Sequence, residues 1–157
     1  MVGDGVGEIN WGDGMRGFLC FGWACLLVVC TCIWDLTELT DSSRLSPPVW
    51  ATAPDWTAFF NGYSLFGEMF LRKVGHFIGF GVLQILFFYY WKRWSASVGA
   101  AVSLALLTEL AQPLFSRGGR ALDVVVDCAG TGAAVLVLLA VQAVRAGIAN
   151  SKKRALP

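Results

Sequence analysis

Four long apolar blocks decide what this chain can fold into. They cover residues 17–34, 74–91, 97–115 and 121–144, and the first two contain no Asp, Glu, Lys or Arg. A helix needs about 20 apolar residues to cross the roughly 30 Å hydrocarbon core of a bilayer. A helix also satisfies its own backbone hydrogen bonds, which an isolated strand in lipid cannot do. The sequence therefore predicts an all-α membrane protein, a bundle of four transmembrane helices.

The composition agrees with a membrane protein and excludes several other classes. Hydrophobic residues make up 56% of the chain and charged residues 15%, whereas soluble domains carry about 25% charge. The formal net charge is only +1, and no basic stripe is present that would attract nucleic acid. We therefore expect one membrane domain of ordinary size, with no nucleic-acid partner.

The positions of lysine and arginine predict how the spans are oriented. Basic residues lie beside both chain ends and in the turn between the second and third spans: Arg16, Lys92, Arg93, Arg145, Lys152, Lys153 and Arg154. Cytoplasmic loops carry an excess of such residues, so we expect both termini in the cytoplasm. The expected organisation is a loose N-terminal segment 1–16, a membrane domain 17–144 and a basic tail 145–157. Because the leader is acidic, the first span is expected to be an uncleaved anchor.

The long connection 35–73 should lie on the outer side of the membrane. Its first half contains Pro47-Pro48, which disfavours regular structure. Its second half carries apolar residues at helical spacing: Trp56, Phe59, Phe60, Tyr63, Phe66, Met69 and Phe70. This pattern predicts an interfacial amphipathic helix that anchors the loop. The alternative is a lid over a site beneath it.

The cysteines predict neither a disulfide framework nor a metal centre. Cys20, Cys25, Cys30 and Cys32 lie in the first span, and Cys128 lies in the fourth. Cysteines in lipid act mainly as small apolar side chains. Cys30 and Cys32 point to different helix faces, which argues against a metal pair. The sequence therefore predicts no cofactor and no metal motif of recognised spacing.

Ionisable side chains inside the spans give the functional signal. A carboxylate at mid-membrane costs about 2.5–3.5 kcal/mol, so such residues are functional candidates by default. Glu109 lies in the third span, Asp127 in the fourth and His76 near the start of the second. At a rise of 1.5 Å per residue, Glu109 and Asp127 lie about 9 Å inside the outer ends of their helices, and His76 about 4–5 Å. Three helices thus place polar groups in one layer of the outer leaflet.

The spacing of the polar residues predicts that they face one another. Lys73 and His76, Glu109 and Gln112, and Asp123 and Asp127 form pairs three or four residues apart, so each pair shares a helix face. All three faces should turn away from lipid and meet, with arginines of the 116–120 turn folded over them. The predicted binding site comprises Lys73, His76, Glu109, Gln112, Arg117, Arg120, Asp123 and Asp127. The structural alternative is a set of buried ion pairs that only hold the helices together.

Small residues in the fourth span predict a close helix contact below this cluster. Asp127, Gly130 and Ala134 continue one face at the spacing that lets two membrane helices approach each other.

The order of these polar residues resembles the VanZ-like family. That family's pattern has K-x-x-H on one span, E-x-x-Q ending the next, and an arginine followed by D-x-x-x-(N/D)-x-x-G opening the last. This chain has Lys73 and His76, Glu109 and Gln112, Arg117, and then Asp123, Asp127 and Gly130. Phe80 stands where the family usually has Tyr, and either Arg117 or Arg120 fits the arginine position. The resemblance implies a small multi-pass protein of the bacterial cell membrane, of a family with some members associated with low-level teicoplanin resistance.

The sequence is compatible with a binding function and with a catalytic function. The favoured function is an outer-leaflet polar cavity that binds an anionic headgroup or a lipid-linked envelope intermediate, with Lys73, Arg117 and Arg120 pairing with it. The first alternative is a hydrolase or transferase acting on a phosphate-containing envelope lipid. Its candidate catalytic residues are His76, Glu109 and Asp127, which with Asp123 could instead hold a hard divalent ion. No Ser or Cys nucleophile is placed with this set. The second alternative is a small partner subunit of a membrane complex.

Overall fold

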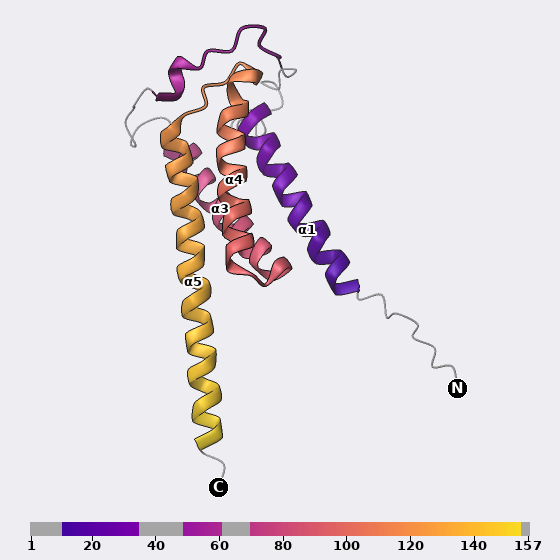
Figure 1. The fold of residues 1–157 in the computed structure, drawn as a ribbon, viewed down its shortest axis with the longest axis vertical. Coiled ribbons are helices and arrows are strands. Elements are labelled where there is room, and N and C mark those ends of the chain that lie inside the picture. The colour runs from indigo at the N-terminus through magenta and orange to yellow at the C-terminus, as the bar shows by residue number, and fades with distance from the viewer. Residues whose placement is uncertain (1–10, 35–48, 61–69, 155–157) are drawn as a thin grey trace, which may run out of the picture.

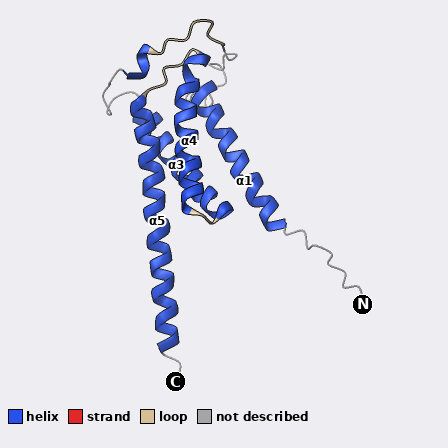
Figure 2. Cartoon of the chain, in the orientation of Figure 1, coloured by secondary structure: helices blue, strands red, loops and turns tan. Residues whose placement is uncertain are grey.

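The regular structure of the chain is helical throughout the part that is described. A computed structural model describes residues 11–34, 49–60 and 70–154. Within these ranges every regular element is a helix (Figure 1), and no strand is present (Figure 2). Four of the helices are long and apolar enough to cross a membrane. The predicted all-α architecture with four membrane-spanning helices is thus confirmed.

The four long helices run alternately up and down the bundle. Helix α1 (Trp11–Val28) continues through one π-helical turn, η1 (Val29–Ile33). Helix α3 (Phe70–Trp91) is followed directly by α4 (Trp94–Ala111), with Lys92 in the left-handed region (φ 52°) at the reversal. A 3₁₀ turn, η4 (Gln112–Phe115), ends α4, and α5 (Ala121–Arg154) completes the chain.

Both described ends of the chain lie at the same end of the bundle (Figure 1). The opposite end, here called the loop end, carries segment 49–60 and η4. Segment 49–60 lies on η4, because the Ala51 N–H donates to the Leu114 carbonyl (2.9 Å) and the Trp50 ring packs edge-on against Phe115. The placement of the termini in the cytoplasm stays a prediction.

The helices extend further than the apolar blocks. Helix α1 begins at Trp11, inside the segment 1–16 expected to be loose, and α5 continues through the expected tail as far as Arg154. A helix can continue past the hydrocarbon because it satisfies its own backbone hydrogen bonds, and Ala, Arg and Lys in the tail favour helix. With 34 residues, α5 is about 51 Å long at 1.5 Å per residue. Its last turns therefore project beyond the other helices (Figure 1).

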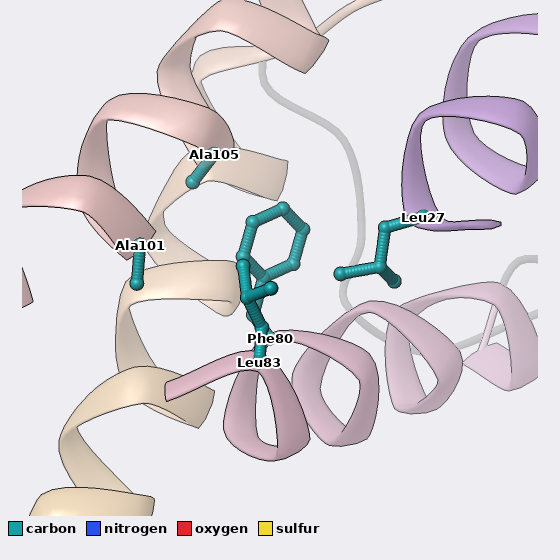
Figure 3. Close-up of a cluster of buried hydrophobic side chains, with 5 residues drawn as sticks. All are labelled: Leu27, Phe80, Leu83, Ala101 and Ala105. Atoms are coloured by element: carbon teal, nitrogen blue, oxygen red, sulfur yellow. The ribbon is translucent and has the colours of Figure 1, made fainter. Parts of the chain in front are cut away.

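The apolar core lies between α1, α3 and α4. Phe80 and Leu83 of α3 are fully buried there, against Leu27 of α1 and Ala101 and Ala105 of α4 (Figure 3). The two alanines leave room for the Phe80 ring between the helices. This core fixes α1 and α4 on the side of α3 that also carries the polar residues.

Helices α3 and α5 make the most extensive helix–helix contact of the bundle. The contact is closest at Gly130, where an added Cβ would collide with the Phe77 carbonyl of α3. Gly81 of α3 faces the same place, because a Cβ added to Gly81 would lie 3.3 Å from the Gly130 carbonyl oxygen. The predicted close approach at Gly130 is confirmed.

The predicted interfacial helix cannot be compared with the structure over its whole length. Residues 57–60 form a short 3₁₀ helix, η3 (Thr57–Phe60), and Phe70 already belongs to α3. Residues 61–69 lie outside the described part of the chain. The amphipathic helix therefore stays a prediction.

Candidate functional site

A cluster of buried polar side chains lies near the loop end, between α3, α4 and α5. Glu109 and Asp127 are 0% exposed and His76 is 6% exposed. The His76 Nδ1 atom is 3.0 Å from Asp127 Oδ1 and 3.8 Å from Glu109 Oε1. The polar faces of the three helices therefore meet as the spacing predicts, with the imidazole between two carboxylates.

The turn between α4 and α5 holds the Glu109 carboxylate in place. Gln112 Nε2 donates to Glu109 Oε1 (2.6 Å), and the Arg120 backbone N–H donates to Glu109 Oε2 (2.9 Å). The turn can close this tightly because position 119 is glycine: an added Cβ would collide with the Glu109 backbone carbonyl. Ser116, in the left-handed region at φ 56°, ends η4 and starts the reversal.

Asp123 is held by an arginine that the sequence analysis did not place in the site. Arg72 pairs with the Asp123 carboxylate at 2.8 Å, where the side chains are 18% and 1% exposed. Arg72 lies four residues before His76, so helical spacing already puts the two on one face of α3. That spacing was the available signal, but Lys73, three residues before His76, shares the face by the same criterion and was the predicted cation.

The remaining predicted cations occupy different positions around the cluster. Lys73 is buried on α3. Arg117 donates from its guanidinium to the Ile33 carbonyl (3.3 Å), which ties the α4–α5 turn to the end of η1. Arg120 reaches the cluster through its backbone N–H. Both arginines thus stay close to the predicted site, in different roles.

A cavity of about 250 Å³ opens beside the cluster, between α1–η1 and α3. Its wall on the α1–η1 side is mainly apolar and includes Leu27 and Cys30, and its wall on α3 includes Gly79, His76 and Arg72. The sequence predicts a polar cavity, but the space is mainly apolar, because Glu109 and Asp127 are enclosed by the helices and do not line it. Two members of the polar layer, Arg72 and His76, reach its wall.

A second hollow, of about 340 Å³, lies at the loop end between segment 49–60 and the α4–α5 turn. Asp55 and Arg117 contribute to its wall. The Asp55 carboxylate accepts hydrogen bonds from the Thr57 N–H (2.9 Å) and hydroxyl (2.6 Å). These bonds hold the pKa of the Asp55 carboxyl below its ordinary value.

Comparison with known sequences assigns the chain to a family. Residues 18–142, which include the whole cluster, match the profile of the VanZ/LLP1 family. The chain is a member of the VanZ/LLP1 family. The resemblance drawn from the polar residues alone is thereby confirmed.

This VanZ/LLP1 protein is also similar to "Uncharacterized membrane protein YwnJ" of Bacillus subtilis (strain 168). The two are 38% identical over 68 residues, which cover 41% of this chain and 46% of YwnJ. The chain therefore matches less than half of the length of that relative. No solved structure matches the chain. The family and the four apolar helices together show a multi-pass membrane protein.

The cluster of this VanZ/LLP1 protein has the chemistry of a proton or cation site. His76, Glu109 and Asp127 each offer one ligand atom, and the three atoms lie within 4.8 Å of one another. Asp127 Oδ2 and Gln112 Oε1 are buried without a hydrogen-bond partner among the described residues. Such atoms are uncommon in folded proteins, since burial without a partner is unfavourable. The cluster is thus able to accept further hydrogen bonds or an ion.

Proposed function

We propose that this chain binds an anionic membrane lipid, with an acyl or prenyl chain in the α1–α3 cavity and its headgroup at Arg72. The observation that carries the proposal is the position of a cation and an imidazole on the wall of a mainly apolar cavity. A site for an anionic lipid needs an apolar space for the hydrocarbon chain and a basic group at the edge of that space for the headgroup. The same chemistry fits a phospholipid and a lipid-linked envelope intermediate.

The size and lining of the cavity favour a single hydrocarbon chain. Its volume of about 250 Å³ is slightly below the roughly 300–1,000 Å³ of sites for drug-sized ligands. Leu27 and Gly79 border it from two helices, and burial of each methylene group contributes about 0.8 kcal/mol. Helices α1 and α3 therefore offer a lipid chain more contact than a flat helix surface does.

Arg72 is the side chain best placed to recognise the headgroup. It remains 18% exposed while it pairs with Asp123. A guanidinium carries five N–H donors in a planar fork, so it can pair with a carboxylate and a phosphate at the same time. In this proposal Asp123 orients the guanidinium, while Lys73, Arg117 and Arg120 add to the positive potential at the loop end.

The proposal is tested by native mass spectrometry of the full chain, released from nanodiscs that contain phosphatidylglycerol and phosphatidylcholine. We expect phosphatidylglycerol to be retained preferentially. Cys30→Trp places a large side chain in the cavity wall and should remove the retained lipid. Cys25→Trp is the matched control, because Cys25 is exposed on α1 outside the cavity. Equal retention by the two variants would overturn the cavity as the binding site.

The headgroup contact is tested with Arg72→Gln, with Arg93→Gln as control because Arg93 is an exposed basic residue at the α3–α4 turn. A charge-assisted hydrogen bond contributes about 1.5–3 kcal/mol, which corresponds to a loss of affinity of roughly tenfold or more. Repeating the measurement with a polyprenyl phosphate in place of phosphatidylglycerol distinguishes the two lipid sources. Retention of neither lipid by the wild-type chain would refute the proposal.

A lipid-linked envelope intermediate as ligand would also connect the chain to teicoplanin susceptibility, the effect that the family resemblance raises. We expect that expression of the wild-type chain changes the inhibitory concentration of teicoplanin and that the Cys30→Trp variant does not. If the wild-type chain and the Cys30→Trp variant change the inhibitory concentration equally, the effect on teicoplanin susceptibility does not depend on lipid binding in the cavity.

A second function, an enzyme acting on the bound lipid, is favoured by the position of His76. This side chain belongs both to the cavity wall and to the cluster with Glu109 and Asp127, where an imidazole and a carboxylic acid could serve as general base and acid. Turnover of a lipid labelled in its phosphate, abolished by His76→Ala, would favour the enzyme. Binding without turnover would favour the lipid-binding function.

A further inference from the structure

Three side chains from three different helices converge on one point inside the bundle. His76 of α3, Glu109 of α4 and Asp127 of α5 are all buried, and their ligand atoms lie within 4.8 Å of one another. His76 and Glu109 are 33 positions apart in the sequence, and Glu109 and Asp127 are 18 apart. The three residues therefore do not form a metal-binding motif with short spacing. Only the packing of α4 and α5 against α3 brings them together.

The separations are close to those of ligands that share a metal ion. Metal–ligand distances of about 2.0–2.2 Å place two ligand atoms roughly 3–3.5 Å apart in tetrahedral or octahedral geometry. In the structure His76 Nδ1 lies 3.0 Å from Asp127 Oδ1 and 3.8 Å from Glu109 Oε1. An ion bound between them would draw the Glu109 carboxylate closer to His76, since 3.8 Å is longer than this range.

A second, independent observation points to a missing partner at this place. Asp127 is 0% exposed, and its Oδ2 atom has no hydrogen-bond partner among the described residues. A buried carboxylate oxygen without a donor is unfavourable by about 1–3 kcal/mol or more. An ion that binds both oxygens of the Asp127 carboxylate would remove this penalty.

The surroundings of the cluster resemble the outer shell of a metal site. Ligand carboxylates in metalloproteins are themselves held by hydrogen bonds. Glu109 is held in this way by the Gln112 side chain and the Arg120 backbone N–H. Asp123, the other buried acid in this layer, is instead paired with Arg72. It is therefore not counted among the ligands.

We propose that His76, Glu109 and Asp127 bind one divalent transition-metal ion of the Zn²⁺ or Mn²⁺ type. Imidazole favours the first-row transition metals, and two carboxylates extend the preference to Mn²⁺. Binding requires a neutral imidazole whose Nδ1 carries no proton, and a proton present on Nδ1 would be released to solvent as the ion binds. Because His76 also lines the α1–α3 cavity, the ion would lie beside that cavity. The inference stands on the cluster alone and does not depend on lipid binding.

The proposal is tested with the full chain, purified in detergent, freed of metal with a chelator and dialysed against Zn²⁺ or Mn²⁺. We expect the wild-type chain to take up one ion. Loss of an outer-shell partner weakens metal binding by about 10- to 100-fold, and loss of a ligand by at least as much, so Asp127→Asn should weaken binding about 100-fold or more. Asp55→Asn, the same chemical change in an exposed carboxylate outside the cluster, should leave the affinity within a few-fold of the wild type.

A spectroscopic measurement on the unmutated chain keeps the test valid if a variant fails to fold. His76 is the single histidine of the sequence, so pulsed electron paramagnetic resonance of bound Mn²⁺ should show coupling to one imidazole nitrogen. Absence of stoichiometric uptake, or uptake without this coupling, would overturn the site. Equal loss of binding in Asp55→Asn and Asp127→Asn would also overturn it. Lipid retention measured on the metal-free chain tests the lipid proposal separately.

Discussion

Asp123 illustrates how single residues compensate charge inside this bundle. Its carboxylate is 1% exposed and is paired with the Arg72 guanidinium at 2.8 Å. An ion pair of this kind contributes little beyond an apolar pair of the same shape, but removal of one partner leaves an uncompensated buried charge. Arg72 is therefore expected to be a structural as well as a binding residue.

Arg72→Met should destabilise the chain by about 1–3 kcal/mol, because it removes the guanidinium that pairs with the buried Asp123 carboxylate at 2.8 Å. The free energy of unfolding in detergent micelles measures the effect. The double variant Arg72→Met/Asp123→Leu should recover much of the loss, since the two residues interact directly. Additive losses in the single and double variants would show that the pair is not coupled.

Asp55 supplies a pH-dependent contact outside the membrane spans. The hydrogen bonds from Thr57 lower its pKa in the folded chain, so their stabilising contribution is present above the ordinary value of about 3.9. The contribution is lost as the pH falls through the lowered pKa of the folded state. Thr57→Ala should raise the pKa of Asp55 toward the ordinary value, as followed by carboxyl NMR titration. An unchanged titration would show that Thr57 does not set it.

Residue spacing predicted the cluster well but not all of its partners. Periods of three and four placed His76, Glu109 and Asp127 on faces that had to avoid lipid, and the structure brings these faces together. The pairing of Asp123 with Arg72 depends on how α3 and α5 are rotated and shifted relative to each other. No pattern within one helix contains that information.

At the scale of elements, the helix contacts depend on small residues. The closest approach of α3 and α5 occurs at Gly130, next to the Phe77 carbonyl. Because this approach positions Asp127 one turn away, it also sets the distance between Asp127 and His76. Small-residue spacing in the sequence was sufficient to predict the contact.

Gly130→Ala should force α3 and α5 apart and destabilise the chain by about 1–3 kcal/mol, as overpacking does elsewhere. Gly132→Ala is the matched control, because an added Cβ there meets nothing within 4 Å. It should be neutral or slightly stabilising, since alanine favours helix more than glycine. Thermal unfolding of both variants in the same detergent provides the comparison. Similar melting temperatures for the two would contradict the close contact.

Helix ends and loops were less predictable than helix interiors. Hydropathy identifies the segment that lies in hydrocarbon, whereas α1 and α5 continue beyond it through residues whose backbone favours helix without needing lipid. The cavity between α1 and α3 could not be predicted, because it arises from how the side chains of two helices far apart in the sequence pack against each other. Such a space depends on helix rotation and tilt.

For the whole molecule, the orientation of the helices decides in which membrane leaflet the cluster lies. The up-and-down arrangement puts the start of α1 and the end of α5 opposite the loop end (Figure 1). The distribution of lysine and arginine predicts that this side is cytoplasmic. The cluster and the cavity entrance would then belong to the outer leaflet.

Cysteines introduced at the two ends of the molecule should react from opposite sides of the membrane. Asn150→Cys on the projecting part of α5 should react with a membrane-impermeant maleimide only in inside-out vesicles. Thr52→Cys at the loop end should react in intact cells. The wild-type chain, with its 5 native cysteines, gives the background. Labelling of Asn150→Cys in intact cells and of Thr52→Cys only in inside-out vesicles would contradict the proposed orientation.

The central claim is that the α1–α3 cavity holds the chain of an anionic lipid, and photocrosslinking tests it most directly. A phosphatidylglycerol with a diazirine on its acyl chain is incorporated into nanodiscs with the full chain, and labelled peptides are mapped by mass spectrometry. We predict labelling of Leu27 and Gly79, buried residues of the cavity wall, that excess unlabelled phosphatidylglycerol suppresses. Labelling confined to exposed α5 residues such as Val125 and Leu136, without such competition, would contradict the account.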